Sequence, residues 1–393
     1  MAYSVSFSGR AHYYTESEIA VATEAMRSAV PLTQGELLRS FEFRFSQYVN
    51  VRHAFAVSNA TAALELVAQL CQFEEGDEVI IPSHTFTSTA YPFAKAGARI
   101  VWADIDVSTR VVTADTIARC ISPQTRAVVV PHLYGYGADM SAIMTLAKTF
   151  ELLVVEDAAQ ALGVMIEGQM AGSFGNFGVY SFHSHKNVTT LGEGGMLVIQ
   201  DSEMAELIPM LRHNGHCSYD YERTDYWIPA MGNVVLPELN GKRLWPVNCC
   251  LGEVECALGV KLLDRIDEIN FQKRQRALSV IDALSDVPEL IFHREASTRH
   301  NYHLLAAQVK NNLRDDFIRE MAHQHGIQCV VQYYPLNRYP FYQKLDMGKA
   351  NCPNADMFFD NMVSFPFQHS IKDSEIDLII SASRETLKQL RNP

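Results

Sequence analysis

The sequence predicts an α/β protein with a mainly parallel sheet followed by a smaller α+β region, on the basis of three observations. First, short β-rich apolar runs alternate with helical patterns over the first half, which is typical of strand–helix–strand units. Second, apolar runs such as Val128–Val130 and Leu152–Val155 suit parallel strands covered on both faces. Third, this alternation stops near residue 202, so a different arrangement follows.

Seven candidate strands and three helical patterns make up the alternating half. The strands are His53–Val57, Glu78–Ile81, Arg99–Trp102, Ala127–Pro131, Leu152–Val155, Val179–Phe182 and Met196–Ile199. The helical patterns are Thr61–Leu70, Ala114–Cys120 and Ser141–Phe150. Strand, helix and strand repeated at this spacing predict a mainly parallel sheet.

The rest of the chain begins with an irregular segment. Tyr219–Arg243 carries prolines and glycines among aromatic and charged residues without a period, which predicts a long loop that is functional or covers a partner. Helical spacing of apolar residues predicts a helix over Leu251–Arg274. The remaining elements are strands Tyr302–Val309 and Ile327–Val331 and helices Asp315–Gln324 and Ser374–Leu387. We therefore expect a large domain at residues 1–245 and a smaller α+β domain at 246–393.

Composition and charge restrict the class of protein. The 33 Lys and Arg against 45 Asp and Glu give a net charge of −12, which disfavours a broad contact with nucleic acid or an anionic membrane. No apolar run is long enough for a transmembrane helix, and the start lacks the features of a signal peptide. Eight cysteines are too sparse for a disulfide scaffold. We expect a cytoplasmic, enzyme-sized protein with reduced thiols.

Asp157 follows the apolar run Leu152–Val155. Ligands of open α/β sheets bind outside the carboxyl ends of the strands, so this carboxylate stands where a site is expected. Two interpretations remain open from the residues alone. Asp157 is either a helix N-cap or loop carboxylate, or an ionised partner for the protonated nitrogen of a heterocycle.

Lys186 follows a later strand, 29 residues after Asp157, and precedes the glycine-rich segment Gly192–Gly195. An exposed surface charge is the commonest fate of a lysine. The alternative is an enclosed amine with a lowered pKa that forms a Schiff base. A lysine and a carboxylate on nearby strand ends are the pair that pyridoxal phosphate requires.

A phosphate site and a ring contact are weaker candidates. The run Ser58-Asn59-Ala60-Thr61 joins a strand to a helix with small residues, where free N–H groups could bind a phosphate or simply be capped. Ser181 could add a hydroxyl to that phosphate or cap its own turn. Phe86 could stack on a cofactor ring, but taken alone a single phenylalanine is expected in the core.

Metal chemistry finds no support in the spacing of the histidines. His183 with His185, and His323 with His325, lack both the i,i+4 spacing of helical ligands and a paired CxxC. We expect no bound metal.

Taken together, these segments resemble the DegT/DnrJ/EryC1/StrS aminotransferases, which are pyridoxal-phosphate enzymes that mostly aminate nucleotide-linked keto-sugars. The resemblance extends over nearly the whole chain. Its blocks are Pro31–Gly35, Ser58–Ala63, Asp104–Asp106, Glu156–Gly163, Ser181–Asn187, Gly192–Gly195, Leu211–Gly215, Gly326-Ile327 and Tyr333–Leu336. It implies the type I aminotransferase fold (aspartate aminotransferase-like), with a large, mostly parallel seven-stranded sheet and a smaller C-terminal α+β domain.

The resemblance also implies roles for residues around the ring of pyridoxal 5′-phosphate. Lys186 matches the lysine that holds the cofactor covalently and then shuttles the proton at the substrate carbon. Asp157 matches the acid bonded to the pyridinium nitrogen. Gln160 matches the residue near the phenolic oxygen, and Phe86 matches the aromatic residue that stacks on the ring, which reverses the expectation from that residue alone.

For the phosphate, the resemblance implies a cradle of Ala60, Thr61 and Ser181. Asn248 matches an asparagine that reaches the phosphate from the neighbouring subunit. A homodimer with shared active sites is therefore expected.

Two departures lie near the expected substrate position. The family often has an arginine two residues after the subunit-crossing asparagine, where this chain has Cys250. A histidine common before the late Tyr-x-Pro-Leu is Gln332 here. Lys242 or Arg243 could supply the missing positive charge, because both stand close to Asn248 in the sequence.

The resemblance implies transfer of an amino group, from glutamate or glutamine, to a nucleotide-linked keto-deoxy sugar. The departures leave another polyhydroxy ketone, such as an inosose or a small ketose phosphate, as an alternative. A sugar dehydratase is disfavoured because Lys186, and not a histidine, stands at the covalent position. A non-catalytic regulator is disfavoured because Lys186, Asp157 and Gln160 are intact.

Overall fold

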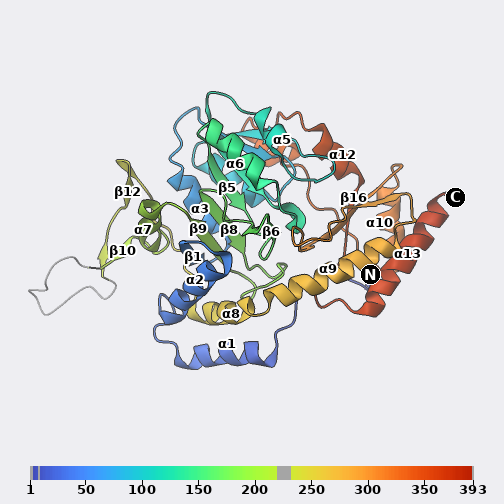
Figure 1. Cartoon of the computed structure of the whole chain (residues 1–393), viewed down its shortest axis with the longest axis horizontal. Helices are drawn as coiled ribbons and strands as arrows, with labels where there is room; N and C mark the ends of the chain where they lie inside the picture. Colours follow the sequence, from blue (N-terminus) through green and yellow to red (C-terminus); the bar gives the residue numbers. More distant parts are fainter. Residues whose placement is uncertain (1–2, 8, 219–231, 392–393) are drawn as a thin grey trace, which may run out of the picture.

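The structure, a computed structural model, describes residues 3–7, 9–218 and 232–391 (Figure 1). A seven-stranded sheet forms its centre, with strand order β1-β9-β8-β5-β4-β2-β3. The strands are β1 (His53–Val57), β2 (Glu78–Pro82), β3 (Arg99–Ala103), β4 (Thr125–Pro131), β5 (Leu153–Asp157), β8 (Phe177–Ser181) and β9 (Gly195–Ile199). All seven predicted strands are confirmed within a few residues at each end.

The sheet is mostly parallel, as predicted. The five strands from β8 to β3 pair in parallel, while β9 runs antiparallel to both of its neighbours, β8 and β1. Strands β8 and β9 are buried at every position, which explains their uninterrupted apolar sequences. Since β1 runs in the same direction as β8, the carboxyl ends of six strands meet at one edge of the sheet.

Helices cover this sheet, and several of them begin at side-chain caps. In α3, α6 and α7 the N-cap side chains of Asn59, Asp139 and Asp201 each accept a bond from the backbone N–H three residues on. Helix α2 packs on α8, which in turn packs on α1, and Figure 1 shows these three below the sheet. The bounds are α1 (Glu16–Ser28), α2 (Glu36–Val49), α3 (Ala60–Leu70), α4 (Tyr91–Lys95), α5 (Ala114–Ala118), α6 (Met140–Thr149), α7 (Ser202–Leu211) and α8 (Glu253–Leu263).

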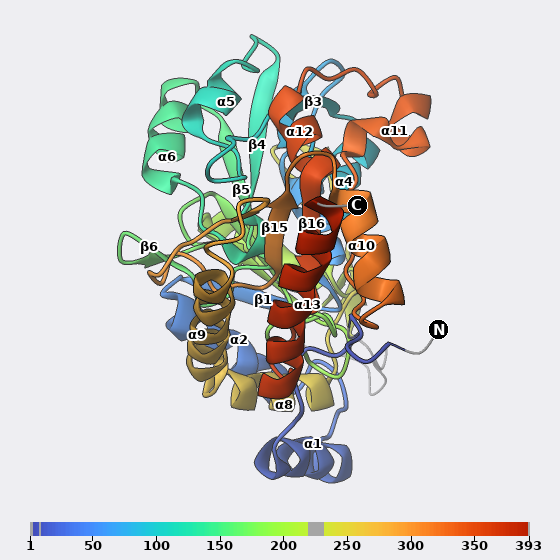
Figure 2. The same cartoon turned by 90° about the vertical axis from the view of Figure 1, so that its right-hand side faces the viewer.

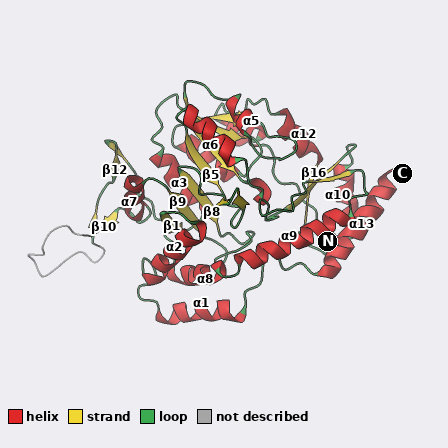
Figure 3. Ribbon diagram, in the orientation of Figure 1, coloured by secondary structure: helices red, strands yellow, loops and turns green. Residues whose placement is uncertain are grey.

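A second, smaller sheet lies in the C-terminal part, with its own apolar core. Strands β14 (Leu290–Phe292), β15 (Leu305–Val309) and β16 (Met362–Phe365) pair antiparallel. Figures 2 and 3 show this sheet beside helices α10 (Arg314–His323) and α13 (Asp373–Arg391). The second core begins in α9 (Ile266–Ala283) and includes Val5 from the N-terminal segment. The division at residues 245 and 246 remains a proposal.

Two sequence predictions differ from the structure, and several elements were not predicted. The expected helix over Leu251–Arg274 is two helices, α8 and α9, which meet at Asp264 and Arg265. The predicted strand Ile327–Val331 is wrong, because this segment bridges Val5 at Ile327 and Ser364 at Val330 and so forms no continuous ladder. The elements that were not predicted include α1, α2, α4, α7, α11 (Pro340–Lys344), α12 (Pro353–Asn361), β14 and β16.

Most of the predicted loop Tyr219–Arg243 lies outside the described residues. On either side of the gap, β10 (His216–Cys217) pairs with β11 (Asn233–Val234). A second ribbon, β12 (Glu238–Leu239) with β13 (Lys242–Arg243), follows. Both ribbons lie at the left of Figure 1.

Among the described helices, none combines the length and the apolar character that a membrane span requires.

Candidate active site

A cavity of about 550 Å³ opens at the edge of the sheet where the strands end. Its wall combines the ends of β5 and β8 and the start of α3 with residues of the C-terminal part. Six of the eight predicted site residues line it, namely Ala60, Thr61, Phe86, Asp157, Ser181 and Lys186. The structure therefore brings together segments that lie far apart in the sequence.

Asp157 is the last residue of β5, and its side chain is buried. Oδ2 accepts a bond from the Thr89 hydroxyl at 2.6 Å, and Oδ1 accepts a bond from the Ala159 N–H at 3.1 Å. Asp157 thus accepts a bond within its own turn and also lines the cavity, while its pairing with a heterocycle remains a prediction. The two donors hold the carboxylate in place at the end of β5.

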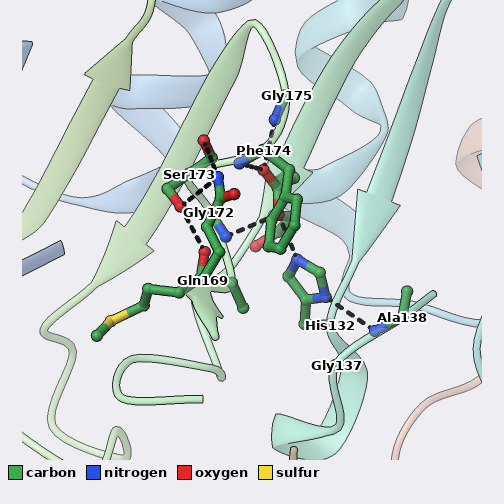
Figure 4. Close-up of polar contacts among 12 residues, drawn as sticks. His132, Gly137, Ala138, Gln169, Gly172, Ser173, Phe174 and Gly175 are labelled. Atoms are coloured by element: carbon green, nitrogen blue, oxygen red, sulfur yellow. Dashed lines mark hydrogen bonds and ion pairs between the residues drawn. The ribbon is translucent and has the colours of Figure 1, made fainter. Parts of the chain in front are cut away.

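The neighbouring Glu156 is fully buried and holds the connection from β5 to β8, in which Gly172, Phe174 and Gly175 of Figure 4 lie. Oε1 accepts bonds from the backbone N–H groups of Phe174 and Gly175 at 2.6 and 2.7 Å. Oε2 accepts one from the Gly172 N–H at 2.7 Å and lies 2.9 Å from His132 Nε2. One buried carboxylate therefore fixes a four-residue stretch of backbone.

His132, the residue after β4, completes this arrangement. Its Nδ1 accepts a bond from the Ala138 N–H at 3.1 Å, so the ring proton lies on Nε2 and is donated to Glu156 (Figure 4). Its backbone N–H donates to the Asp157 carbonyl at 3.0 Å. His132 and Glu156 thus support the backbone that carries Asp157.

Lys186 follows β8, is half-buried and lines the cavity. Burial lowers the pKa of this amine from its ordinary value to about 8, and the Asp157 carboxylate opposes that shift. The surface-lysine alternative is therefore wrong. An amine with such a pKa is partly neutral near physiological pH, which is the form that attacks a carbonyl carbon.

The start of α3 offers hydrogen-bond donors to the cavity. Asn59 caps the Ala62 N–H, whereas no hydrogen bond from the Ala60 or Thr61 N–H occurs within the described residues. The Thr61 hydroxyl donates to Ser88 at 2.9 Å. Free N–H groups at a helix N-terminus bind anions.

The absence of a Cβ at Gly195 lets the N-terminus of α3 approach the sheet. A Cβ at this position would lie 2.5 Å from the Asn59 carbonyl carbon and 2.7 Å from the Ala60 nitrogen. Ser181, which pairs with Gly195 between β8 and β9, lines the same part of the cavity. The absence of a side chain at Gly195 therefore sets the place of the helix N-terminus.

Phe86 is 48% exposed, so the expectation of a core residue is wrong for it. Its ring lies edge-on to Tyr333 at 5.6 Å between centroids, and both rings line the cavity. An exposed aromatic face on a cavity wall can contact a planar ligand.

Two predicted residues do not line this cavity. Gln160 is buried behind the wall, where its amide accepts from the Tyr134 N–H at 2.6 Å and donates to the Tyr333 hydroxyl at 3.2 Å. Asn248 is exposed, and its backbone bridges His213. Contacts of both residues with a cofactor remain predictions.

The proposed replacement cations also lie away from the cavity wall of their own subunit. Lys242 pairs with Glu74 at 2.9 Å, and Arg243 lies 3.8 Å from Glu238. Of the two departures from the family pattern, Gln332 lines the cavity, whereas Cys250 donates from its thiol to the Arg212 carbonyl at 3.3 Å.

Sequence reasoning missed several residues of the wall. Lys273 of α9 and His303, before β15, line the cavity, and Thr89, which is not on its wall, donates to Asp157. Neither Lys273, which stands between Gln272 and Arg274, nor His303 has a sequence signal that reveals a contact with a distant segment. No group of three or more metal-ligating side chains occurs within the described ranges.

Comparisons with known proteins agree with this geometry. The model of the DegT/DnrJ/EryC1/StrS aminotransferase family matches residues 12–384. The spore coat polysaccharide biosynthesis protein SpsC of Bacillus subtilis is 32% identical over 387 residues, covering 95% of each chain. A UDP-N-acetyl-3-dehydro-α-D-glucosamine 3-aminotransferase of Acidithiobacillus ferrooxidans is 29% identical over 350 residues, covering 89% of this chain and 88% of the relative.

Among solved structures, the PLP form of Spr1654 from Streptococcus pneumoniae superposes with a TM-score of 0.85. It is 26% identical, and the match covers 98% of this chain and 99% of that one. The similarity therefore extends over both sheets and the cavity between them.

Proposed function

Because the chain belongs to the DegT/DnrJ/EryC1/StrS aminotransferase family, we propose that it transfers the amino group of glutamate or glutamine to a keto-sugar linked to a nucleotide. The chain is a pyridoxal 5′-phosphate-dependent aminotransferase, as its family is. The amino acid would leave as the corresponding 2-oxo acid and the ketone as an amino sugar. The observation that carries the proposal is the meeting of the Lys186 amine and the Asp157 carboxylate in one cavity.

The residues of the cavity fit this cofactor. Gly195 leaves the space that a Cβ would fill at the start of α3, where the N–H groups of Ala60 and Thr61 can receive a phosphate. Ser181 can add its hydroxyl, and Phe86 can contact a ring. When bound, the cofactor supplies a carbonyl group that takes up the amine and a ring that accepts the electron pair of the substrate carbon.

The chain's own residues would then perform three tasks. Lys186 would hold the cofactor and, once released from it, move the proton at the substrate carbon. Asp157, fixed by Thr89 and Ala159, would keep a ring nitrogen protonated. Ser181 and the start of α3 would neutralise the phosphate and set its position.

An absorption experiment tests the proposed reaction. The purified protein is loaded with pyridoxal 5′-phosphate, and glutamate is then added. We expect a visible band that bleaches with glutamate in the wild type and in Lys148→Ala, an exposed lysine on α6. In Lys186→Ala the covalent band should not form. A band that ignores both glutamate and glutamine would contradict the proposed donors.

The acceptor is tested with a panel of ketones. A relative acts on a 3-keto nucleotide sugar according to its name, which supports this class of substrate. Gln332 on the cavity wall, where the family commonly has histidine, supports a second candidate, a polyhydroxy ketone without a nucleotide. The pyridoxamine form is mixed with 3-keto and 4-keto nucleotide sugars, an inosose and a ketose phosphate. Recovery of the visible band with only the last two would replace the first proposal by the second.

A further inference from the structure

His303 lies on the cavity wall, and the proposed reaction gives it no task. Its side chain is only 4% exposed. Its backbone is held on both sides, because the N–H donates to Asn301 Oδ1 at 2.9 Å and the carbonyl accepts from the Lys273 amine at 3.0 Å. The ring is held as well, with Nδ1 3.4 Å from Asn187 Oδ1. His303 is thus fixed at three points.

A chain of amides determines which ring nitrogen carries the proton. The carbonyl of Leu162 can only accept, so the bond of 2.9 Å from Asn270 fixes Asn270 Nδ2 toward it. Asn270 Oδ1 then accepts from Asn187 Nδ2 at 2.8 Å, which leaves Asn187 Oδ1 as an acceptor. His303 Nδ1 must therefore donate its proton to Asn187, and Nε2 carries the lone pair.

The surroundings keep this ring neutral. Burial moves the pKa of His303 well below its usual range, and Lys186, Lys273 and His185 lower it further. Within the described residues no hydrogen bond reaches Nε2. The cavity therefore contains a fixed, neutral acceptor without a protein donor.

Such an acceptor selects the chemistry of its ligand. Ketone oxygens, carboxylates and phosphates only accept hydrogen bonds, so none of them can pair with Nε2. A hydroxyl can donate, and a buried acceptor that stays unpaired weakens binding. We infer that His303 binds, through Nε2, a hydroxyl group of the ketone substrate, and this inference rests on the proposed function.

The place of this hydroxyl follows from the neighbours of His303. Asn187, its partner, is the residue after Lys186, and the Lys186 charge acts on the His303 ring. The hydroxyl therefore belongs to the reacting end of the substrate, beside the ketone, and not to a remote nucleotide. Lys273 is a positioning residue here, since its amine bonds the carbonyls of His303 and Phe367, the latter at 3.2 Å.

Two variants separate this role from a structural one. Asparagine places an amide where Nδ1 lies, so His303→Asn keeps the donor to Asn187 and loses the acceptor toward the cavity. Glutamine places an amide where Nε2 lies, so His303→Gln keeps that acceptor and loses the bond to Asn187. If His303 recognises a hydroxyl, His303→Gln should keep more activity toward the ketone than His303→Asn. If its role is purely structural, His303→Asn should keep more activity than His303→Gln.

The kinetic probe is a pair of ketones, UDP-N-acetyl-3-dehydro-α-D-glucosamine and its 4-deoxy counterpart, which lacks the hydroxyl beside the ketone. We expect the wild type to prefer the hydroxylated ketone roughly tenfold in kcat/KM, His303→Gln to keep most of this preference, and His303→Asn to lose it. The half-reaction with glutamate, which has no hydroxyl, is the internal control and should change less than about twofold in both variants. An equal loss of kcat/KM with both ketones would overturn the inference. So would a loss of the same size in the half-reaction with glutamate.

A measurement independent of turnover checks the acceptor itself. In ¹⁵N-histidine-labelled holoenzyme, with the His303 signal assigned from its loss in His303→Gln, we expect a neutral ring protonated at Nδ1. A proton on Nε2, or a charged ring at neutral pH, would overturn the inference whatever the kinetics show.

If the wild type aminates neither ketone although the ring has the expected form, the choice of a nucleotide-linked ketone fails. The ketone pair is then replaced by scyllo-inosose and its 2-deoxy counterpart, and equal turnover of those two would overturn the inference.

Discussion

The Asp157 carboxylate acts on the pKa of the Lys186 amine, and this gives a prediction for the pH dependence of cofactor capture. Only the neutral amine attacks a carbonyl, so capture of pyridoxal 5′-phosphate by the cofactor-free protein should accelerate as the pH rises through about 8. The Asp157 anion raises the pKa of the amine, so Asp157→Asn should move this midpoint to lower pH. Stopped-flow absorbance from about pH 6 to 10 measures the midpoint.

The control for this experiment is Lys186→Ala, in which capture should be absent at every pH. A midpoint that is the same in Asp157→Asn and in the wild type would show that the carboxylate does not act on the amine. A midpoint near the ordinary lysine value would show that the amine is hydrated in solution.

Glu156 is a second residue whose chemistry can be tested, because every bond at its carboxylate is a donation to oxygen. In Glu156→Gln one oxygen becomes an NH₂ group that cannot accept, so two buried donors lose their partner in either orientation of the amide. We expect the free energy of unfolding to fall by roughly 2–4 kcal/mol. Urea unfolding, with Glu24→Gln on the exposed face of α1 as the control, measures this change. A loss no larger than that of the control would contradict the assigned role of Glu156.

At the scale of the elements, the contact between β9 and the start of α3 sets the phosphate site. A Cβ in Gly195→Ala would meet backbone atoms of Asn59 and Ala60 at 2.5–2.9 Å, which cannot rotate away as a side chain could. The helix N-terminus must shift, and the affinity for pyridoxal 5′-phosphate should fall about tenfold or more. Equilibrium titration of the cofactor-free protein measures the affinity.

The matched control is Gly97→Ala, where a Cβ has no neighbour within 4 Å but the backbone has φ +98°. Strain at this turn should lower stability without changing cofactor affinity. Equal cofactor affinities in the two variants would show that the approach of β9 to α3 is not what places the phosphate.

The same elements show what the sequence could and could not predict. Strands of the large sheet are found correctly because they are buried on both faces, as in β8 and β9. The segment Ile327–Val331 has a similar apolar pattern but changes its partner within three residues, and no periodicity shows that. Asp157 and Lys186 could be proposed as site residues since Asp157 ends β5 and Lys186 lies in the segment after β8. Lys273 and His303 were missed since only packing of the C-terminal part brings them to the cavity.

At the scale of the whole molecule, the region around Asn248 has the properties of a subunit contact. Asn248 itself is exposed, and Trp245, three residues earlier, is 70% exposed. Val30 and Leu32, on the segment that bridges Gly252, are also exposed apolar side chains. Exposed apolar side chains close to a predicted cross-subunit residue support the proposed homodimer.

A mixing experiment tests whether two chains share each site. Lys186→Ala and Asn248→Ala are each expected to be nearly inactive, the first for want of the amine and the second because it leaves the partner's phosphate site incomplete. In a mixed dimer, one site combines the Lys186 of one chain with the Asn248 of the other, while the second site lacks both. Random exchange makes half of the dimers mixed, so about a quarter of the wild-type activity should return.

This recovery depends only on geometry, because neither variant carries a complete site alone. Reversible unfolding of the two variants together, followed by refolding and assay, gives the measurement, and the variants refolded separately are the control. If each site were built within one chain, mixing would restore nothing above the separate values. If Asn248→Ala alone were nearly as active as the wild type, Asn248 would not belong to the site. The prediction of a shared site in a homodimer would then lose the residue on which it rests.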